Sequence, residues 1–527
     1  MNHAVFSRPL RRVVALTLTL ATGACFIYRT VGVESIVAPA APAKAVHVAS
    51  AVKAHLSDGT TVVFRDGVTI DQGTVRGDGL AYDLLLNGKG GISTIPLSSV
   101  VAMENFQTGV NPVASFAIST LATVGVIGLS VAIYCASNPK CFGSCPTAYS
   151  DSAGTSVLEA EGFSYAIAPL FEMRDVDRLR TPAGPDGAVR LEIRDEALET
   201  HYINQLQLLE VRHAPDEFVA PDPRGNPIVV RGLHAPFAAT DRAGRNVLAA
   251  LEAHDGVVFR TDSATLAGAS ARDAEDWIDL DLPAPPQGDS AVLVLRLRNS
   301  LLTTVLLYDL MLADHGARAL DYMAENLQHI GSATELGRWY AGAMGMRVSV
   351  WDGSAWRQSG RFLDTGPIAW KELAVMIPNP TGGPLRVRLS FPADDWRIDR
   401  VAVARTAHRA TPRTIPLAAV IRSDGRPDSA ALVNLREADE RYLETTAGQR
   451  FDAVFQTGAE PADSARTFLL AWQGFYYEWI RRGWLERGHD STAFRPGAAA
   501  LAEAQRRWRE SQGPMEVQFG RTRVPVR

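Results

Sequence analysis

Two aspartates spaced for shared chemistry, Asp279 and Asp281, lie in the segment DWIDLDLP (276–283). Apolar and acidic residues alternate strictly there, which predicts a β-strand. Residues two apart on a strand share a face, so the two carboxylates would lie roughly 6 to 7 Å apart. That spacing suits a glycosidase acid pair or a calcium site. It also suits the solvent-facing side of a sandwich strand, which is the interpretation we favour.

The rest of the sequence offers no established catalytic motif. It contains no Walker loop, GxSxG elbow, HExxH or GxGxxG. His201 and His213 have no nucleophile placed to act with them, so we interpret both as structural strand residues. We assign no catalytic residue, no metal ligand and no cofactor, and we favour a protein that is not an enzyme.

Three cysteines, Cys135, Cys141 and Cys145, fall within YCASNPKCFGSCPTAY (134–149). A zinc site would need a second close cysteine pair or spaced histidines, and this pattern is incomplete. In an exported chain we predict a Cys141–Cys145 disulfide across the turn that contains glycine. Buried thiols are the alternative, because free cysteine behaves as a small hydrophobe.

Aromatic residues could supply a different kind of site. All ten tryptophans lie beyond residue 270, so the two halves of the chain differ in character. If Trp351 and Trp370 lie on flat exposed surfaces, their rings could stack on sugars. Burial in the core is the more frequent use of aromatic side chains, and both alternatives stay open.

The charge distribution excludes one class of partner. The formal net charge is −5, and no segment is strongly basic after the first dozen residues. A nucleic-acid partner therefore has no electrostatic footprint in this sequence. The length, 527 residues, predicts three or four domains.

The N-terminus has the anatomy of an export signal. In MNHAVFSRPLRRVVALTLTLATGAC (1–25), arginines precede a short apolar run and then small residues. The ending Gly-Ala-Cys resembles the lipobox of bacterial lipoproteins, and the resemblance implies that Cys25 carries the lipid. Thr22 departs from the usual Leu three residues before the cysteine. An ordinary signal peptide or an uncleaved anchor is the alternative, and VAPAAPAKA (37–45) would form a tether beyond it.

A second apolar stretch, VASFAISTLATVGVIGLSVAIYC (113–135), has no charge and is long enough to span a bilayer. Its small residues permit close helix packing in a membrane, although a buried helix of a soluble domain has a similar sequence. We expect membrane contact through the lipid anchor, through 113–135, or through both. A single crossing after a lipidated Cys25 would place the C-terminal bulk in the cytoplasm, so the topology is open.

The segment from SCPTAY through LEAEGFSYAIAPLF to THYINQLQLLEVRH resembles a module of uncharacterised bacterial envelope proteins. The resemblance covers residues 141–225 and rests on the Cys-Pro start, a Gly-aromatic segment and a THYIN strand. It implies a bacterial, extracytoplasmic protein and brings no known activity.

These observations predict a mainly β fold with a small N-terminal β-domain, one apolar helix, and two or more β-sandwich modules of jelly-roll type with a few helices. Two segments predict helices, ARALDYMAENLQHI and AAALAEAQRRWRESQ, and RTFLLAWQGFYYEWI predicts a strand followed by a helix. The predicted division is a signal segment (1–25), an Ala/Pro linker (26–45), the small β-domain (46–110), the apolar helix (112–136), the Cys-Pro module (137–225), a β-sandwich (226–320), a second sandwich or its continuation (346–410), and a mixed C-terminal region (411–527).

The sequence therefore favours a non-catalytic binding or scaffolding protein, anchored in a bacterial cell envelope, with a protein or glycan partner. The bulk of the chain would be periplasmic or surface-exposed. An envelope polysaccharide hydrolase and a subunit of a membrane complex are the alternatives. Fold analogy alone would license none of the three.

Overall fold

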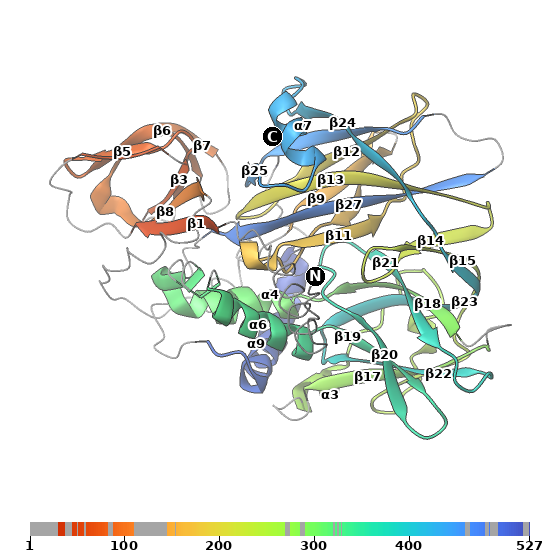
Figure 1. Cartoon of the computed structure of the whole chain (residues 1–527). Helices are drawn as coiled ribbons and strands as arrows, with labels where there is room; N and C mark the ends of the chain where they lie inside the picture. Colours follow the sequence, from red (N-terminus) through yellow and green to blue (C-terminus); the bar gives the residue numbers. More distant parts are fainter. Residues whose placement is uncertain are drawn as a thin grey trace, which may run out of the picture.

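The computed structural model describes the ranges 30–36, 45–49, 51–56, 60–82, 88–109, 145–152, 154–268, 274–284, 290–319, 329–458, 464–479 and 494–519, together with Tyr322, Met323, Asn326, Leu327, Trp484 and Val526. Within these residues the fold is mainly β, with four sheets and a few helices. A small N-terminal module lies beside a larger body (Figure 1). The predicted mainly β class with sandwich modules is confirmed, whereas the predicted apolar helix (112–136) lies outside the described residues.

The N-terminal module is one eight-stranded sheet in the order β1-β8-β3-β4-β6-β5-β2, with β7 paired to β6. Its strands are β1 (Thr30–Ile36), β2 (Val46–Val48), β3 (Ala51–Leu56), β4 (Thr61–Phe64), β5 (Val68–Asp71), β6 (Thr74–Tyr82), β7 (Gly88–Pro96) and β8 (Val100–Gly109). The sheet curls around its own core, in which Val52, Phe64 and Met103 are fully buried. The turn after β4 requires Gly67, because its φ is +82° and a Cβ would lie 2.0 Å from the Val48 carbonyl oxygen.

The predicted linker (26–45) is partly wrong, because Thr30–Ile36 forms strand β1. It pairs antiparallel with β8 along its whole length, from Thr30 opposite Gly109 to Ile36 opposite Met103. The segment TVGVESI is rich in β-branched residues, which favour strands, and the Ala/Pro-rich composition begins only at Val37. We treated 26–45 as one Ala/Pro-rich segment and therefore did not detect this strand.

A nine-stranded large sheet combines the Cys-Pro module with the C-terminal region. Its order is β10-β9-β12-β26-β24-β13-β27-β11, with β25 paired to β13. The strands are β9 (Thr147–Ser152), β10 (Thr155–Glu161), β11 (Met173–Arg178), β12 (Ala188–Arg194), β13 (Glu199–His213), β24 (Arg413–Arg422), β25 (Leu443–Thr446), β26 (Arg450–Gln456) and β27 (Ala465–Glu478). Segments that the sequence placed in separate regions (137–225 and 411–527) therefore form one unit.

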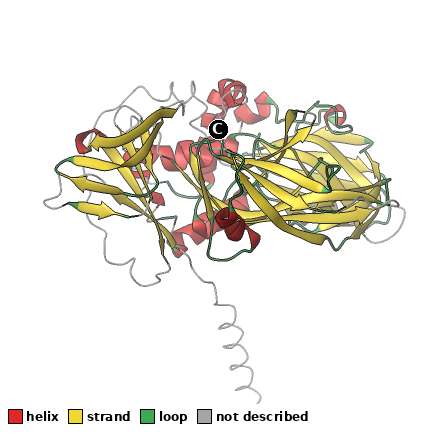
Figure 2. Cartoon of the chain, turned by 90° about the horizontal axis from the view of Figure 1, so that it is seen from above, coloured by secondary structure: helices red, strands yellow, loops and turns green. Residues whose placement is uncertain are grey.

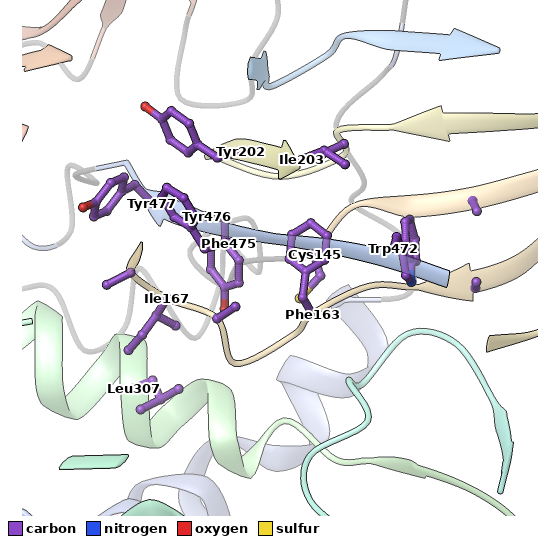
Figure 3. Packing of buried hydrophobic residues seen from close by; sticks show 14 of the residues in the cluster. Cys145, Phe163, Ile167, Tyr202, Ile203, Leu307, Trp472, Phe475, Tyr476 and Tyr477 are labelled. Atoms are coloured by element: carbon purple, nitrogen blue, oxygen red, sulfur yellow. The ribbon is translucent and has the colours of Figure 1, made fainter. Parts of the chain in front are cut away.

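Strand β24 joins the two halves of the large sheet. Its first residues pair with β13 and its later residues pair with β26, so the sheet bends there and folds over one core. Figure 3 shows part of that core, where Trp472, Phe475 and Tyr476 of β27 gather with Tyr202 of β13. The predicted change from strand to helix within the aromatic segment is wrong up to Glu478, because β27 stays paired with β13 to that residue.

Segments 226–320 and 346–410 contribute to a single sandwich of two five-stranded sheets. The first sheet is β14 (Glu217–Pro221), β15 (Pro227–His234), β23 (Trp396–Arg409), β18 (Ser290–Asn299) and β21 (Lys371–Pro378) in spatial order. The second is β16 (Ala238–Asp241), β17 (Glu275–Leu282), β22 (Leu385–Pro392), β19 (Met346–Trp351) and β20 (Trp356–Phe362). Alternate residues of both sheets, such as Ile278, Leu295 and Ile398, fill one shared core.

The described helices lie at several places around the sheets, and the largest group lies between the strands of the N-terminal module and those of the larger body (Figure 2). They are α3 (Ser263–Gly268), α4 (Leu302–Thr304), η6 (Val305–Leu312), η7 (Ala313–Arg318), α6 (Ile330–Ala343), α7 (Ser429–Arg436), α9 (Ala498–Phe519) and the single turns η1 (Leu97–Ser99), η4 (Pro169–Phe171) and η5 (Leu248–Ala250). The predicted C-terminal helix is confirmed as α9, whereas α6 begins only at Ile330. None of the helices in the described part of the chain is long and apolar enough to cross a bilayer, and 113–135 lies outside that part.

The sandwich is fastened to the large sheet by buried charges. Lys371 of β21 contacts Asp175 and lies 2.8 Å from Asp177, both on β11. Burial lowers the pKa of Lys371, but the two carboxylates outweigh this effect and raise it, so the ammonium stays charged. The first sheet of the sandwich thus lies against the large sheet, and β17, β19, β20 and β22 lie on the far side (Figure 1).

Candidate binding face

Strand β17 presents its polar residues on the outside of the sandwich, as its sequence predicts. Ile278 and Leu280 are buried, whereas Trp277, Asp279 and Asp281 alternate with them and are partly exposed. The two predicted carboxylates therefore do share one face of one strand. The same alternation places Trp277 on this face, because Trp277 lies two residues before Asp279.

The hairpin of β19 and β20 adds two further tryptophans. Trp351 lies opposite Trp356, and the rings meet edge to face with centroids 5.5 Å apart. Asp352 shapes the turn between them by accepting hydrogen bonds from the Ser354 and Ala355 backbone N–H groups, each at 2.8 Å. The Asp352-Gly353 turn closes this hairpin, so both rings lie on paired strands.

Arginines from β22 lie between these tryptophans. The Arg388 guanidinium is 4.9 Å from the Trp277 ring and 4.6 Å from the Trp356 ring. The Arg386 guanidinium is 5.5 Å from the Trp351 ring and 5.8 Å from the Trp356 ring. We call this surface the Trp–Arg face; it consists of Trp277, Asp279, Asp281, Trp351, Trp356, Arg386 and Arg388.

The Trp–Arg face is preorganised without belonging to the core. Each cation–π contact of this kind is worth about 0.5–1 kcal/mol at an exposed site, so the series holds its rings in place. The inward residues of β17 and β22, such as Leu280 and Val387, already complete the sandwich core. The sandwich core therefore does not need the outward-facing tryptophans for its packing.

Both carboxylates of the Trp–Arg face form ion pairs with arginines. Asp279 lies opposite Arg388 in the sheet and accepts two hydrogen bonds from it, at 2.6 and 2.7 Å. Asp281 lies opposite Arg386, with 3.7 Å between their charged atoms. A bidentate ion pair adds geometric specificity as well as energy to the contact. Both ion pairs therefore help to order the outer surface of β17 and β22.

Trp370 does not join this surface. It precedes β21 in the first sheet, where the guanidinium groups of Arg296 and Arg298 lie 5.2 and 5.1 Å from its ring. Arg296 in turn donates to Asp399 at 2.7 Å. The sequence grouped Trp351 with Trp370, but the structure brings Trp351 together with Asp279 and Asp281 instead.

The cysteine predictions fall largely outside the described residues. Cys25 and Cys141 are not among them, and Cys145 is buried and forms no disulfide with a described residue. Burial and the nearby Glu161 raise the pKa of the Cys145 thiol well above its ordinary value. The disulfide and the lipidation both remain predictions. In the described part of the chain, no group of three or more His, Cys, Asp or Glu side chains is placed to hold a metal ion.

The sequence did not identify Trp277, Trp356, Arg386 or Arg388 as site residues. The alternation in LRVRLSFP places both arginines on one face of β22. Which strand lies beside β22, and in which register, depends on pairing between β17, β19 and β22 across a hundred residues of sequence. That pairing cannot be read from any local pattern.

Comparisons with known proteins name no relative. No protein family and no curated protein matches the chain. Among solved structures, a cycloalternan-forming enzyme from Listeria monocytogenes is similar over 64% of this chain and 31% of its own, at 11% identity and a TM-score of 0.16. A GH31 alpha-xylosidase from Xanthomonas citri is similar over 84% and 38%, at 10% identity and a TM-score of 0.15. The chain thus spans about a third of the length of these enzymes, and the likeness is too weak to carry an argument.

Proposed function

We propose that this chain is a non-catalytic binding or scaffolding protein of a bacterial cell envelope, and that the Trp–Arg face contacts its protein or glycan partner. The observation that carries the proposal is the series of three partly exposed tryptophans interleaved with arginines on one sheet. Such side chains are enriched where proteins meet partners, because they offer large apolar area and directional hydrogen bonds together.

The arrangement suits recognition better than reaction. Tryptophan rings held between arginines lose little conformational freedom when a partner covers them. The outer edges of Arg386 and Arg388 can donate to hydroxyl, carboxylate or carbonyl oxygens of that partner.

The envelope location rests on the N-terminal sequence. A positive segment, a short apolar run and Gly-Ala-Cys support export followed by lipid attachment at Cys25. Residues 113–135 could add a second membrane contact. On this proposal the sandwich faces the periplasm or the cell surface, where glycans and envelope proteins are accessible.

Cosedimentation with purified peptidoglycan sacculi tests the glycan arm of the proposal. We expect the wild-type chain to sediment, and the double variant W351A/W356A to lose about tenfold or more in affinity, because stacked aromatic anchors contribute several kcal/mol to such contacts. W370A is the matched control, since Trp370 also lies on two arginines but on the other sheet. Equal sedimentation of wild type and double variant would contradict the proposal. Failure of the wild type to sediment would exclude peptidoglycan and leave a protein partner.

A further inference from the structure

A cleft lies between the N-terminal module and the large sheet, away from the Trp–Arg face. Its volume is about 620 Å³. Leu80 and Tyr82 of β6 line one wall, and residues of β24, α7 and β25 line the other. Figure 1 shows α7 and β25 on the side of the body that faces the N-terminal module. A volume of this size is typical of small-molecule sites.

The two walls are held at a fixed separation by a buried joint beneath the cleft. Val63 of the N-terminal module packs with Ala447 and Trp479 of the body. Tyr82 meets the Trp479 ring edge to face at 6.2 Å, and Lys53 Nζ lies 4.6 Å from that ring. Tyr82 and Ala447 belong both to this joint and to the cleft lining. The cleft is therefore preformed.

Three arginines and two carboxylates line the cleft: Arg65, Arg422 and Arg450, with Asp428 and Glu444. Arg450 is already paired with Glu192, which is not part of the lining. Arg65 is exposed and makes no ion pair with any described residue. Arg422 has only a loose contact with Asp424, at 3.7 Å, with both side chains largely exposed. Asp428 lies on the same wall as Arg422, and its carboxylate caps α7 by accepting from the Ala431 N–H at 2.9 Å. Arg65 comes from the N-terminal module and Arg422 from the body, so an anion that reaches both side chains would contact both modules.

The remainder of the lining mixes polar and apolar groups. Tyr82 and Leu80 offer a ring and an apolar patch, while Ser423 and Gln449 offer hydrogen-bonding side chains. A fatty ligand would leave these polar groups without partners, and a bare inorganic ion would fill little of the volume. A sugar has the complementary combination, with an apolar ring face surrounded by hydroxyl groups.

We propose that this cleft is a second binding site, which takes an acidic sugar of one or two rings. Its carboxylate or phosphate lies between Arg65 and Arg422, and a sugar ring lies against Tyr82. The site is independent of the Trp–Arg face, so the two proposals stand or fall separately. A ligand here contacts both modules at once and adds to the contacts that already join them.

Isothermal titration of the full chain with three probes tests the site: digalacturonate, glucose 6-phosphate and the neutral disaccharide maltose. We expect at least one acidic probe to bind, maltose to bind at least tenfold more weakly, and affinity to fall as salt is added. Binding of digalacturonate alone would identify a carboxylate ligand, and binding of glucose 6-phosphate alone a phosphate ligand.

Variants locate the binding. R65A and R422A should each weaken the acidic probe about tenfold, the equivalent of one charge-assisted contact of about 1.4 kcal/mol. R224A is the control, because Arg224 is also an exposed arginine in a turn and does not line the cleft. W351A/W356A should bind the probe as the wild type does. The proposal is overturned if neither acidic probe binds, if maltose binds equally well, or if R65A and R422A bind like R224A.

Discussion

At the scale of single residues, two tryptophans in similar surroundings have opposite roles. Trp277 begins WIDL in β17, and Trp396 begins WRID in β23. Trp396 is fully buried between the two sheets of the sandwich, whereas Trp277 is partly exposed on the Trp–Arg face, 5.0 Å from the Arg242 guanidinium. Each role depends on whether the tryptophan lies on the inner or the outer face of its strand. The sequences WIDL and WRID do not indicate which face that is.

We predict that the two tryptophans differ sharply in their contribution to stability. Trp396→Ala should lower the free energy of unfolding by about 3–5 kcal/mol, because it opens a cavity in the sandwich core. Trp277→Ala should cost only about 1–2 kcal/mol, the worth of a partly covered ring and its cation–π contacts. Urea denaturation followed by circular dichroism measures both values. Similar losses for the two variants would contradict the inside–outside assignment.

Glu161 of β10 is a buried acid that joins the large sheet to the sandwich. Its Oε2 accepts hydrogen bonds from the Ile368 and Ala369 backbone N–H groups, at 2.7 and 2.9 Å. Burial raises the pKa of Glu161 to about 8, although those two hydrogen bonds and the nearby Lys371 oppose the shift. The folded chain therefore holds a proton at neutral pH that the unfolded chain has already released.

This proton makes stability depend on pH with a definite sign. Between about pH 4.5 and pH 8 the folded state binds one more proton at Glu161 than the unfolded state, so its contribution to stability falls as pH rises, by up to about 1.4 kcal/mol per pH unit. Glu161→Gln keeps an oxygen for the two N–H donors but cannot ionise. We expect the variant to lose less stability than the wild type between pH 5 and pH 8 in urea titrations. Parallel profiles would show that Glu161 is already ionised in the folded protein.

At the scale of elements, the sequence predicted the β-strands of the sandwich well and the aromatic segment poorly. The hairpin at Asp352-Gly353 and the alternating strand 275–282 depend on neighbours in the chain, so a local pattern suffices. In β27 the spacing of the aromatic residues along the sequence also fits a helix. The segment forms a strand because it pairs with β13, which lies more than two hundred residues earlier in the chain. Tyr202 lies opposite Phe475 there, and their rings stack with centroids 4.7 Å apart.

Helix α9 shows how one element can hold two modules. Trp508 is fully buried in the core of the large sheet, and its Nε1 donates to Asp394 of the sandwich at 2.7 Å. The Arg507 guanidinium contacts Asp309 of η6 and Asp314 of η7, at 3.1 and 2.8 Å. The sequence identified this helix from its composition, but the composition gives no indication of where it docks.

We predict that Trp508→Phe lowers the free energy of unfolding by about 1–3 kcal/mol, because an aromatic ring remains while the buried Asp394 carboxylate loses a donor. Arg506→Ala, on the exposed side of the same helix, removes ion pairs with Glu503 and Glu510 and should cost about 0.5 kcal/mol. Chemical denaturation of the two variants compares them directly. A larger loss of stability from Arg506→Ala than from Trp508→Phe would mean that the Arg506 side of the helix, not the Trp508 side, is buried.

At the scale of the whole molecule, the sequence predicted the class of fold and missed its connectivity. The mainly β class, the small N-terminal module and the sandwich follow from short alternating segments and their turns. The large sheet could not be predicted, because β9–β13 and β24–β27 come from distant parts of the chain and only their shared core brings them together. The Trp–Arg face depends on the same kind of long-range pairing, which is why four of its residues were not identified as site residues.

The central claim is that a partner covers the Trp–Arg face, and oxidative footprinting of tryptophan tests it even while the partner is unidentified. The full chain is exposed to hydroxyl radicals alone and after mixing with a bacterial envelope fraction, and oxidation of each tryptophan is measured by mass spectrometry. We predict several-fold protection of Trp277, Trp351 and Trp356 in the mixture, with Trp370 oxidised to the same extent in both samples. Unchanged oxidation of those three residues, or equal protection of Trp370, would contradict the assignment of this face as the binding surface.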